Sequence, residues 1–116
     1  MFKTYIKETR RTRATLLSRL DNQLHMVMGI STEAGELLDI YKRRLAYDKQ
    51  LDGVNVEEEL GDLMWYVAGL VDMLGFDMEK ILTKNIAKLQ VRYPEAFDEE
   101  KAINRDLEKE REILET

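Results

Sequence analysis

The sequence predicts an all-α protein: a bundle of four or five helices in a single domain of 116 residues. Apolar residues recur at steps of three and four over most of the chain, which is the period of an amphipathic helix. The chain contains one proline and shows few of the alternations that mark strands. It has no cysteine, which excludes disulfides and thiolate metal sites.

The first two helices follow from apolar spacing and from one capping residue. The first is expected over residues 2–20, with a basic run at 10–13 that is expected on a solvated face. Its ragged apolar face consists of Phe2, Tyr5, Ile6, Leu16, Leu17 and Leu20. Asp21 is a suitable N-cap for a second helix that runs to about Tyr47. Residues 48–53 are expected to form a loop.

The third and fourth helices have clearer boundaries. Asn55 and Glu58 resemble a capping box, so the third helix is expected to open there and to stop at Gly75, a natural left-handed position. Asp77 is the expected N-cap of the fourth helix, which Pro94 ends. The core of the domain is therefore expected over residues 20–97. Residues 98–116 form a highly charged tail, expected as a helix on a neighbour or frayed in solvent.

The overall charge excludes some classes of binding partner. A formal charge of -5 argues against a general nucleic-acid binder, which needs a basic face. No apolar segment reaches the length of a signal peptide core or a membrane span. We therefore expect a cytoplasmic protein without a nucleic-acid or membrane partner.

Two short stretches repeat each other and carry most of the functional signal. Glu33-Ala-Gly-Glu36 is echoed by Glu59-Leu-Gly-Asp62, and each copy continues with two large apolar residues. Acids three positions apart lie on one helix face, roughly 60° from each other. In both helices the acidic pair falls on the same flank of the apolar stripe, so antiparallel packing can bring the pairs together across one cleft.

Four carboxylates at the edge of one helical core repel each other unless a positive charge lies among them. A hard divalent cation is the simplest partner, and such a cation among acids is typical of phosphate chemistry. Glycine inside a helix costs about 1 kcal/mol relative to alanine. Gly35 and Gly61 are therefore expected to let a backbone or a ligand approach closely beside the acids.

The residues around these pairs resemble the MazG-type all-α nucleoside triphosphate pyrophosphohydrolases. The resemblance covers roughly residues 20–97 and rests on three segments: Gly-Ile-Ser-Thr-Glu-Ala-Gly-Glu at 29–36, Glu-Leu-Gly-Asp-Leu-Met-Trp-Tyr at 59–66 and Lys-Asn-Ile-Ala-Lys-Leu-Gln-Val-Arg-Tyr-Pro at 84–94. It implies metal-dependent cleavage of a (deoxy)nucleoside triphosphate between the α- and β-phosphates, which gives a monophosphate and pyrophosphate. It also implies a homodimer or dimer of dimers and a role in removing unwanted nucleotides.

The resemblance assigns roles to individual residues. Mg²⁺, with Mn²⁺ as a possible substitute, would bind to Glu33, Glu36, Glu59 and Asp62. Either Glu36 or Glu59 would accept the proton of the attacking water. The residues expected to bind the nucleotide and its phosphates are Lys42, Asn85, Lys88, Arg92 and Tyr93.

Three other residue groups are weaker candidates. His25 is the only histidine and lacks the Glu-x-x-His spacing of a ligand, so we expect it at the edge of the core or in an interface. Trp65 and Tyr66 can stack on a nucleobase or fill a contact between helices, and the second is the more frequent role. The basic run at 10–13 can also reach a partner's phosphates.

Competing functions remain open. A carboxylate-bridged di-iron protein is disfavoured because it needs Glu-x-x-His pairs. A non-catalytic helical dimer with the same fold is a second alternative, and the intact acids argue against it. A phosphoribosyl-ATP pyrophosphatase would share the reaction, although no residue points to its substrate. The base and the sugar of the nucleotide are not specified by the sequence.

Overall fold

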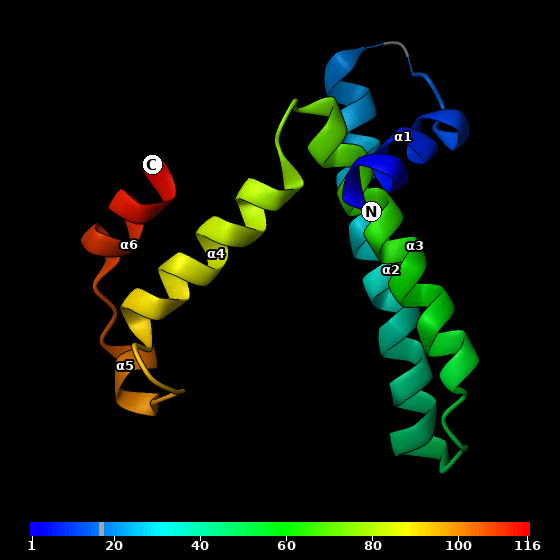
Figure 1. The fold of residues 1–116 in the computed structure, drawn as a ribbon. Coiled ribbons are helices and arrows are strands. Elements are labelled where there is room, and N and C mark those ends of the chain that lie inside the picture. Colours follow the sequence, from blue (N-terminus) through cyan, green and yellow to red (C-terminus); the bar gives the residue numbers. More distant parts are fainter. Residues whose placement is uncertain (17) are drawn as a thin grey trace. The chain divides into compact units, whose positions relative to one another are not determined.

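A computed structural model describes residues 1–16 and 18–116, and within these residues it contains helices and no strand (Figure 1). The all-α prediction is confirmed. The helices are α1 (Phe2–Thr12), α2 (Arg19–Tyr47), α3 (Gly53–Met73), α4 (Met78–Arg92), α5 (Glu99–Ile103) and α6 (Leu107–Glu115). None of them is both long and apolar enough to span a membrane.

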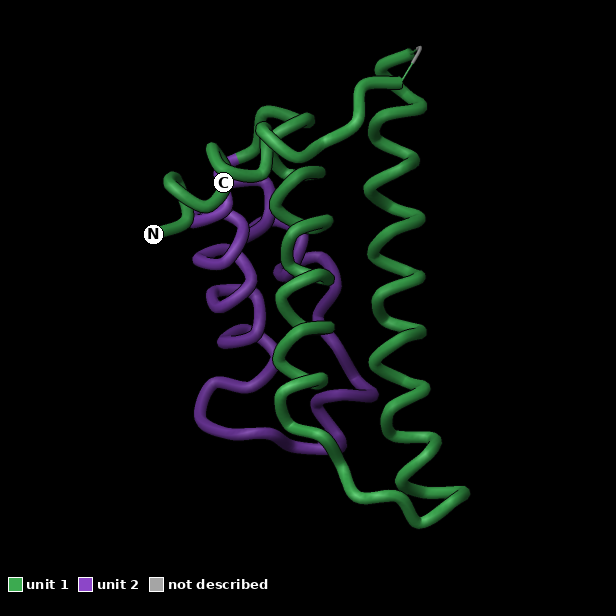
Figure 2. Tube along the Cα trace, turned by 90° about the vertical axis from the view of Figure 1, so that its right-hand side faces the viewer, with its two compact units in different colours: residues 1–76 green, residues 77–116 purple. Residues whose placement is uncertain are grey.

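The described residues form six helices instead of the four or five expected, because the tail folds as two short ones. The chain also divides into two compact units, residues 1–76 and residues 77–116 (Figure 2). The division falls between α3 and α4. A single domain over 1–116 stays a prediction.

The first helix is shorter than predicted. It ends at Thr12, and Arg13 has an extended backbone with φ -81° and ψ 135°. Leu17 lies outside the described residues. The N-cap of α2 is Ser18 and not Asp21, because the Ser18 Oγ accepts a hydrogen bond from the Asp21 backbone N–H at 3.0 Å. Leu16 therefore belongs to the connection and Leu20 to the start of α2.

The start of α3 also differs from the prediction, whereas both ends of α4 match it. Asp52 caps α3 by accepting from the backbone N–H groups of Val54 and Asn55, so the helix opens at Gly53 instead of Asn55. Gly75 has a φ of +70°, the left-handed conformation expected after this helix. Asp77 caps α4, which ends at Arg92.

In the first unit, α2 and α3 form a closely packed helical hairpin (Figure 1). Gly29 of α2 faces the Tyr66 ring, and a Cβ atom at this position would lie 2.1 Å from the ring. Gly69 of α3 faces Met26 in the same way, and a Cβ there would lie 2.7 Å from the Met26 Sδ. Glycine at these two positions therefore sets how closely the helices approach.

Helix α1 packs on α3 and is anchored there by two arginines. The Arg10 Nη2 and Arg13 Nη2 donate to the two carboxylate oxygens of Asp72 at 2.7 and 2.6 Å. Arg13 also donates to the Gly69 backbone carbonyl at 2.9 Å. Hydrogen bonds from Arg10 and Arg13 lower the pKa of Asp72 to about 2. The basic run thus anchors a helix, and it is not simply a solvated face.

In the second unit, α6 packs on α4, and the tail is therefore a helix on a neighbour, one of the two expected arrangements. Ile103 and Leu107 are both exposed. The buried residue of α6 is instead the charged Glu110, whose carboxylate binds two arginines. An ion cluster therefore joins the tail to α4.

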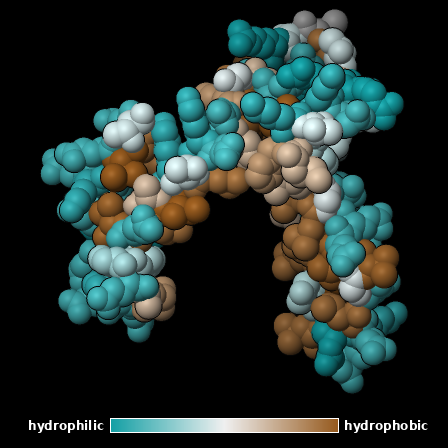
Figure 3. All heavy atoms as spheres, in the orientation of Figure 1, coloured by the Kyte–Doolittle hydropathy of each residue, from teal (hydrophilic) through white to brown (hydrophobic). Residues whose placement is uncertain are grey.

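Large apolar side chains remain exposed in both units. Leu45, for example, is 90% exposed, and Figure 3 shows apolar side chains gathered along the α2–α3 pair and along α4. The exposed members include Leu24, Val27, Met28, Leu38, Tyr41, Leu45, Leu60 and Met64 in the first unit, and Ile81, Leu82, Ile86 and Leu89 in the second. Surfaces of this extent usually mark an interface.

The glycines of α2 offer a matched test of the packing. We expect Gly29→Ala to lower the free energy of unfolding by about 1–3 kcal/mol, because its methyl group must displace the Tyr66 ring. Gly35→Ala is the control on the same helix, since no atom lies within 4 Å of the place that its methyl group would take. It should raise the free energy by up to about 1 kcal/mol.

Urea denaturation at one fixed protein concentration, followed by circular dichroism, measures both effects. Equal effects of the two substitutions would contradict the packing described for Gly29. A destabilising Gly35→Ala would indicate that a second copy or a ligand occupies the space beside Gly35.

Candidate functional site

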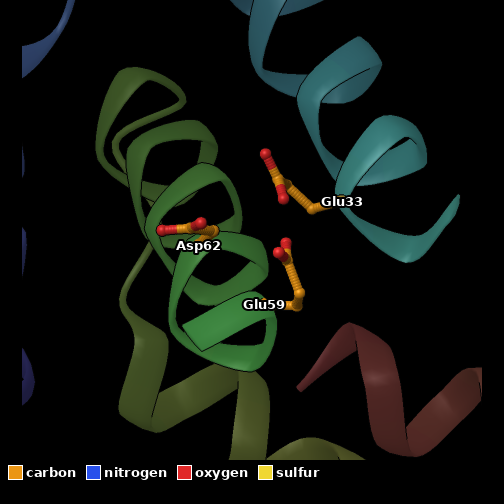
Figure 4. Close-up of side chains that lie close together, drawn as sticks. All are labelled: Glu33, Glu59 and Asp62. Carbon is orange, nitrogen blue, oxygen red and sulfur yellow. The ribbon is translucent and has the colours of Figure 1, made fainter. Parts of the chain in front are cut away.

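Three of the four predicted acids lie together between α2 and α3. Glu33 comes from α2, and Glu59 and Asp62 come from α3 (Figure 4). One carboxylate oxygen from each of these residues lies within 4.8 Å of the other two. Glu33 and Glu59 point toward each other from the two helices. The helical hairpin therefore brings one acid of the first pair, Glu33, to both acids of the second pair.

The charges of this acidic cluster act on Glu59 in particular. Its pKa is raised from the ordinary value, first by a hydrogen bond with Glu33, then by burial and by the negative charges around it. Glu33 and Glu59 are half-buried, and Asp62 is exposed. Since the negative charges oppose one another, the cluster favours a bound proton or a cation.

Glu36 does not join the other three acids within that spacing. It is exposed on α2, one turn beyond Glu33, and its charge still contributes to the raised pKa of Glu59. The described residues thus bring together three of the predicted ligands and leave the fourth on the rim.

A pocket of about 340 Å³ opens beside the cluster. Its lining consists of Thr12, Glu33, Asp62, Trp65 and Tyr66. The Trp65 Nε1 donates to the Thr12 Oγ1 at 2.9 Å, and the Trp65 and Tyr66 rings meet edge to face at 5.0 Å. The two aromatic residues therefore pack against each other and also line the pocket.

Helix α1 contributes to this site, which the sequence did not indicate. Thr12 lines the pocket, and the Tyr5 hydroxyl donates to the Gly61 backbone carbonyl at 3.4 Å. Burial, followed by the charge of Asp62, raises the pKa of Tyr5. No pattern in the first twenty residues marks these contacts, because they depend on where Arg10 and Arg13 anchor α1.

The space beside the Cα atoms of the two glycines inside the acidic motifs is open in the described chain. A Cβ atom at Gly35 or Gly61 would have no neighbour within 4 Å. The expectation that a backbone packs against them is therefore wrong for this chain's own elements. The glycines that meet a neighbour are Gly29 and Gly69, because they lie on the side of each helix that faces the other.

The residues expected to bind the nucleotide are spread over both units. Lys42 is exposed on α2, two turns beyond the cluster. In the second unit, Asn85 is exposed and Lys88 is half-buried on α4. Arg92 binds Glu110, and Tyr93 packs against Phe97 with ring centroids 5.4 Å apart. Among the candidate residues of the second unit, Arg92 is the one that forms an ion pair, with Glu110.

His25 lies apart from the acids. Its ring meets Tyr66 edge to face at 6.1 Å, and its Nδ1 is buried without a hydrogen-bond partner among the described residues. This placement fits the expected position at the edge of the core.

Comparison with known proteins gives a clear family assignment. Residues 21–97 match the model of the MazG nucleotide pyrophosphohydrolase domain. The chain is also 37% identical over 75 residues to the Gene 37 protein of Mycobacterium phage L5, a match that covers 59% of this chain and 63% of that protein. The chain thus matches less than two thirds of the length of this relative. No solved structure matches the chain.

The family match spans α3 and α4 and nearly all of α2, and it includes both acidic motifs. It therefore agrees with the resemblance seen in the sequence and with the convergence of the acids between α2 and α3. The chain belongs to the MazG nucleotide pyrophosphohydrolase family.

Proposed function

We propose that this protein is a metal-dependent pyrophosphohydrolase that cleaves a nucleoside triphosphate to a monophosphate and pyrophosphate. The observation that carries the proposal is the convergence of Glu33, Glu59 and Asp62, whose oxygens lie within 4.8 Å of one another. Carboxylate oxygens are the hard ligands that Mg²⁺ and Mn²⁺ prefer. The residues present therefore fit the metal that the family implies.

The proposed site uses all four acids. Glu33, Glu59 and Asp62 would hold the metal, with Glu36 completing its ligands from the rim. A bound divalent cation would neutralise the charge of the phosphates and polarise a water molecule. Either Glu36 or Glu59 would accept the proton of the attacking water.

The reaction balances as a hydrolysis. Water adds to the α-phosphorus, the bond from that phosphorus to the bridging oxygen breaks, and pyrophosphate leaves. The proton of the water passes to the base. Positive side chains would hold the phosphates, and we assign this role to Lys42, Lys88 and Arg92, with Asn85 and Tyr93 contacting the rest of the nucleotide.

We further propose that the active species is a homodimer or a dimer of dimers. The exposed apolar side chains along α2, α3 and α4 would be covered by a second copy. A role in removing unwanted nucleotides in the cytoplasm is consistent with this assignment. The base and sugar of the substrate need a direct test, which also separates this function from a phosphoribosyl-ATP pyrophosphatase and from a non-catalytic module.

The products of the reaction test the proposed function. We expect at least one nucleoside triphosphate, in a panel of purified ribo- and deoxyribonucleotides that includes phosphoribosyl-ATP, to give the monophosphate and pyrophosphate only with Mg²⁺ or Mn²⁺. Separate detection of pyrophosphate and inorganic phosphate measures this. Release of single phosphates, or full activity in excess chelator, would rule the proposal out.

Substitutions of the acids separate a metal site from a structural cluster. We expect Glu59→Gln, Glu36→Gln and Asp62→Asn each to reduce kcat by about 100-fold or more. Without metal, Glu59→Gln should melt at the same temperature as the parent or higher, because it removes a charge that its neighbours oppose. Mg²⁺ should raise the melting temperature of the parent more than that of this variant.

Asp39→Asn is the control, since Asp39 pairs with Arg43 on the exposed side of α2 and lies outside the cluster. It should keep both the activity and the effect of Mg²⁺. Variants of the cluster that melt well below the metal-free parent would show that these acids are structural.

The oligomeric state tests the apolar faces. We expect sedimentation at low micromolar concentration to show at least a dimer, because the exposed leucines and methionines are too numerous for a stable monomer. Leu38→Glu on α2 should shift the protein toward monomer and reduce activity, whereas Asp39→Asn beside it should change neither. A fully active monomer would contradict the shared interface.

A further inference from the structure

Glu110 of α6 is a buried carboxylate outside the residues that match the family. It is 2% exposed, although it carries a charge and lies on a short helix. Its Oε1 accepts from the Arg92 Nε at 2.9 Å, and its Oε2 accepts from the Arg105 Nη2 at 2.7 Å. The family match ends at residue 97, so Arg105 and Glu110 are features of this chain's tail.

Both arginines meet Glu110 through the same edge of the guanidinium group. Arg92 and Arg105 each use Nε and Nη2, as the two bonds from each to the carboxylate show. A guanidinium group has five N–H donors in one plane. The N–H groups on Nη1 of both residues therefore point away from Glu110. The guanidinium group of Arg92 also lies 5.6 Å from the centre of the Tyr93 ring, and the Tyr93 side chain contributes to the raised pKa of Arg92.

The charges of this triad leave an excess of one positive charge. Two guanidinium groups and one carboxylate sum to +1, in a chain whose formal charge is -5. Bonds from Arg92 and Arg105 lower the pKa of Glu110 to about 2, so the carboxylate is ionised at neutral pH. The side chains of Arg92 and Arg105 are 15% and 37% exposed, so each reaches solvent.

Fixed guanidinium groups are suited to phosphate, because their planar N–H pairs match two oxygens of one group. A free arginine loses side-chain entropy when it binds, and one already held by a carboxylate loses less. Arg92 is also the residue that the family resemblance places at the phosphates. The tail thus fixes a side chain that the proposed reaction needs.

We propose that Glu110 is a positioning residue that fixes Arg92 and draws Arg105 beside it, and that the N–H groups of the two arginines that face away from Glu110 bind a phosphate of the nucleotide. The C-terminal tail is then part of the phosphate-binding machinery, and Arg105 is an additional binding residue. The identity of the anion as a nucleotide phosphate rests on the proposed function. The binding of a phosphate group by the triad does not depend on the proposed function.

The direction in which Glu110→Gln changes anion affinity distinguishes two roles of Glu110. It either positions the arginines for the anion or masks their charge from it. Glu110→Gln removes a negative charge beside both arginines, so a masking role for Glu110 predicts tighter binding of an anion. A positioning role predicts weaker binding, because both guanidinium groups lose their anchor and repel each other. The two roles therefore predict opposite changes.

The experiment is a titration of the full-length chain with inorganic pyrophosphate in the absence of divalent metal. The arginine side-chain Nε–Hε signals are followed by NMR, and Arg92→Gln and Arg105→Gln identify the two signals by their loss. We expect both signals to shift in the parent. Glu110→Gln and Arg105→Gln should each raise the Kd for pyrophosphate about tenfold.

Matched controls lie on the same helix. Arg111 and Glu115 form an exposed ion pair at 2.6 Å, so Arg111→Gln and Glu115→Gln make the same charge changes away from the triad. Both should leave the Kd within about twofold of the parent value. If Glu110→Gln lowers the helical content of the tail, the more exposed Arg105→Gln still tests whether Arg105 binds the anion, and a Kd equal to that of the parent would overturn that role.

Tighter binding by Glu110→Gln, unshifted Arg92 and Arg105 signals, or equal effects of triad and control variants would overturn the inference. A separate assay of nucleotide hydrolysis keeps the two proposals apart. Hydrolysis that is unaffected in Arg105→Gln would leave the proposed function standing and remove the tail from it. If pyrophosphate shifts the two arginine signals but the protein hydrolyses no nucleotide, phosphate binding by the triad would stand and the proposed function would be wrong.

Discussion

The close approach of α2 and α3 is the constraint on which the site depends. Gly29 admits the Tyr66 ring against the backbone of α2, and Gly69 admits Met26 against α3. Glu33 lies one turn after Gly29, and Asp62 lies one turn before Tyr66, so each acid is on the same face as a residue of the contact. The packing that brings Gly29 and Tyr66 together therefore also brings the acids together. Packing and electrostatics oppose each other at this place, because the contact that stabilises the hairpin also concentrates its negative charge.

The acids near the two ends of α3 have different electrostatic surroundings. Asp72, near the C-terminal end, receives Arg10 and Arg13, and its pKa falls to about 2. Glu59, near the other end, faces Glu33 and has a raised pKa. The chain supplies cations where an acid anchors α1 and supplies none within the described surroundings of Glu59. This contrast on one helix favours a functional reading of the cluster, since the same chain neutralises a structural carboxylate with its own arginines.

Much of this site could be predicted from the repeated acidic motif, and the failures have one physical cause. Helical periodicity gives the face on which a residue lies, so the convergence of Glu33, Glu59 and Asp62 was predictable. It does not give the residue on the partner helix that lies opposite, so Gly35 and Gly61 were assigned the close contacts that belong to Gly29 and Gly69. Contacts between distant segments escape the sequence in the same way: Thr12 beside Trp65, and Glu110 beside Arg92. Helix ends were missed where a nearer cap competed, as with Ser18 and Asp52.

The distribution of apolar side chains connects stability with function. The large apolar side chains that are buried in the described chain are few, namely Met26, Val71 and Met78, whereas leucines of α2 such as Leu38 and Leu45 are exposed. Leu38 and Leu45 lie on the helix that also carries Glu33 and Glu36, two of the four predicted acids. A second copy that covers this face of α2 would bury these leucines and stabilise the helical hairpin.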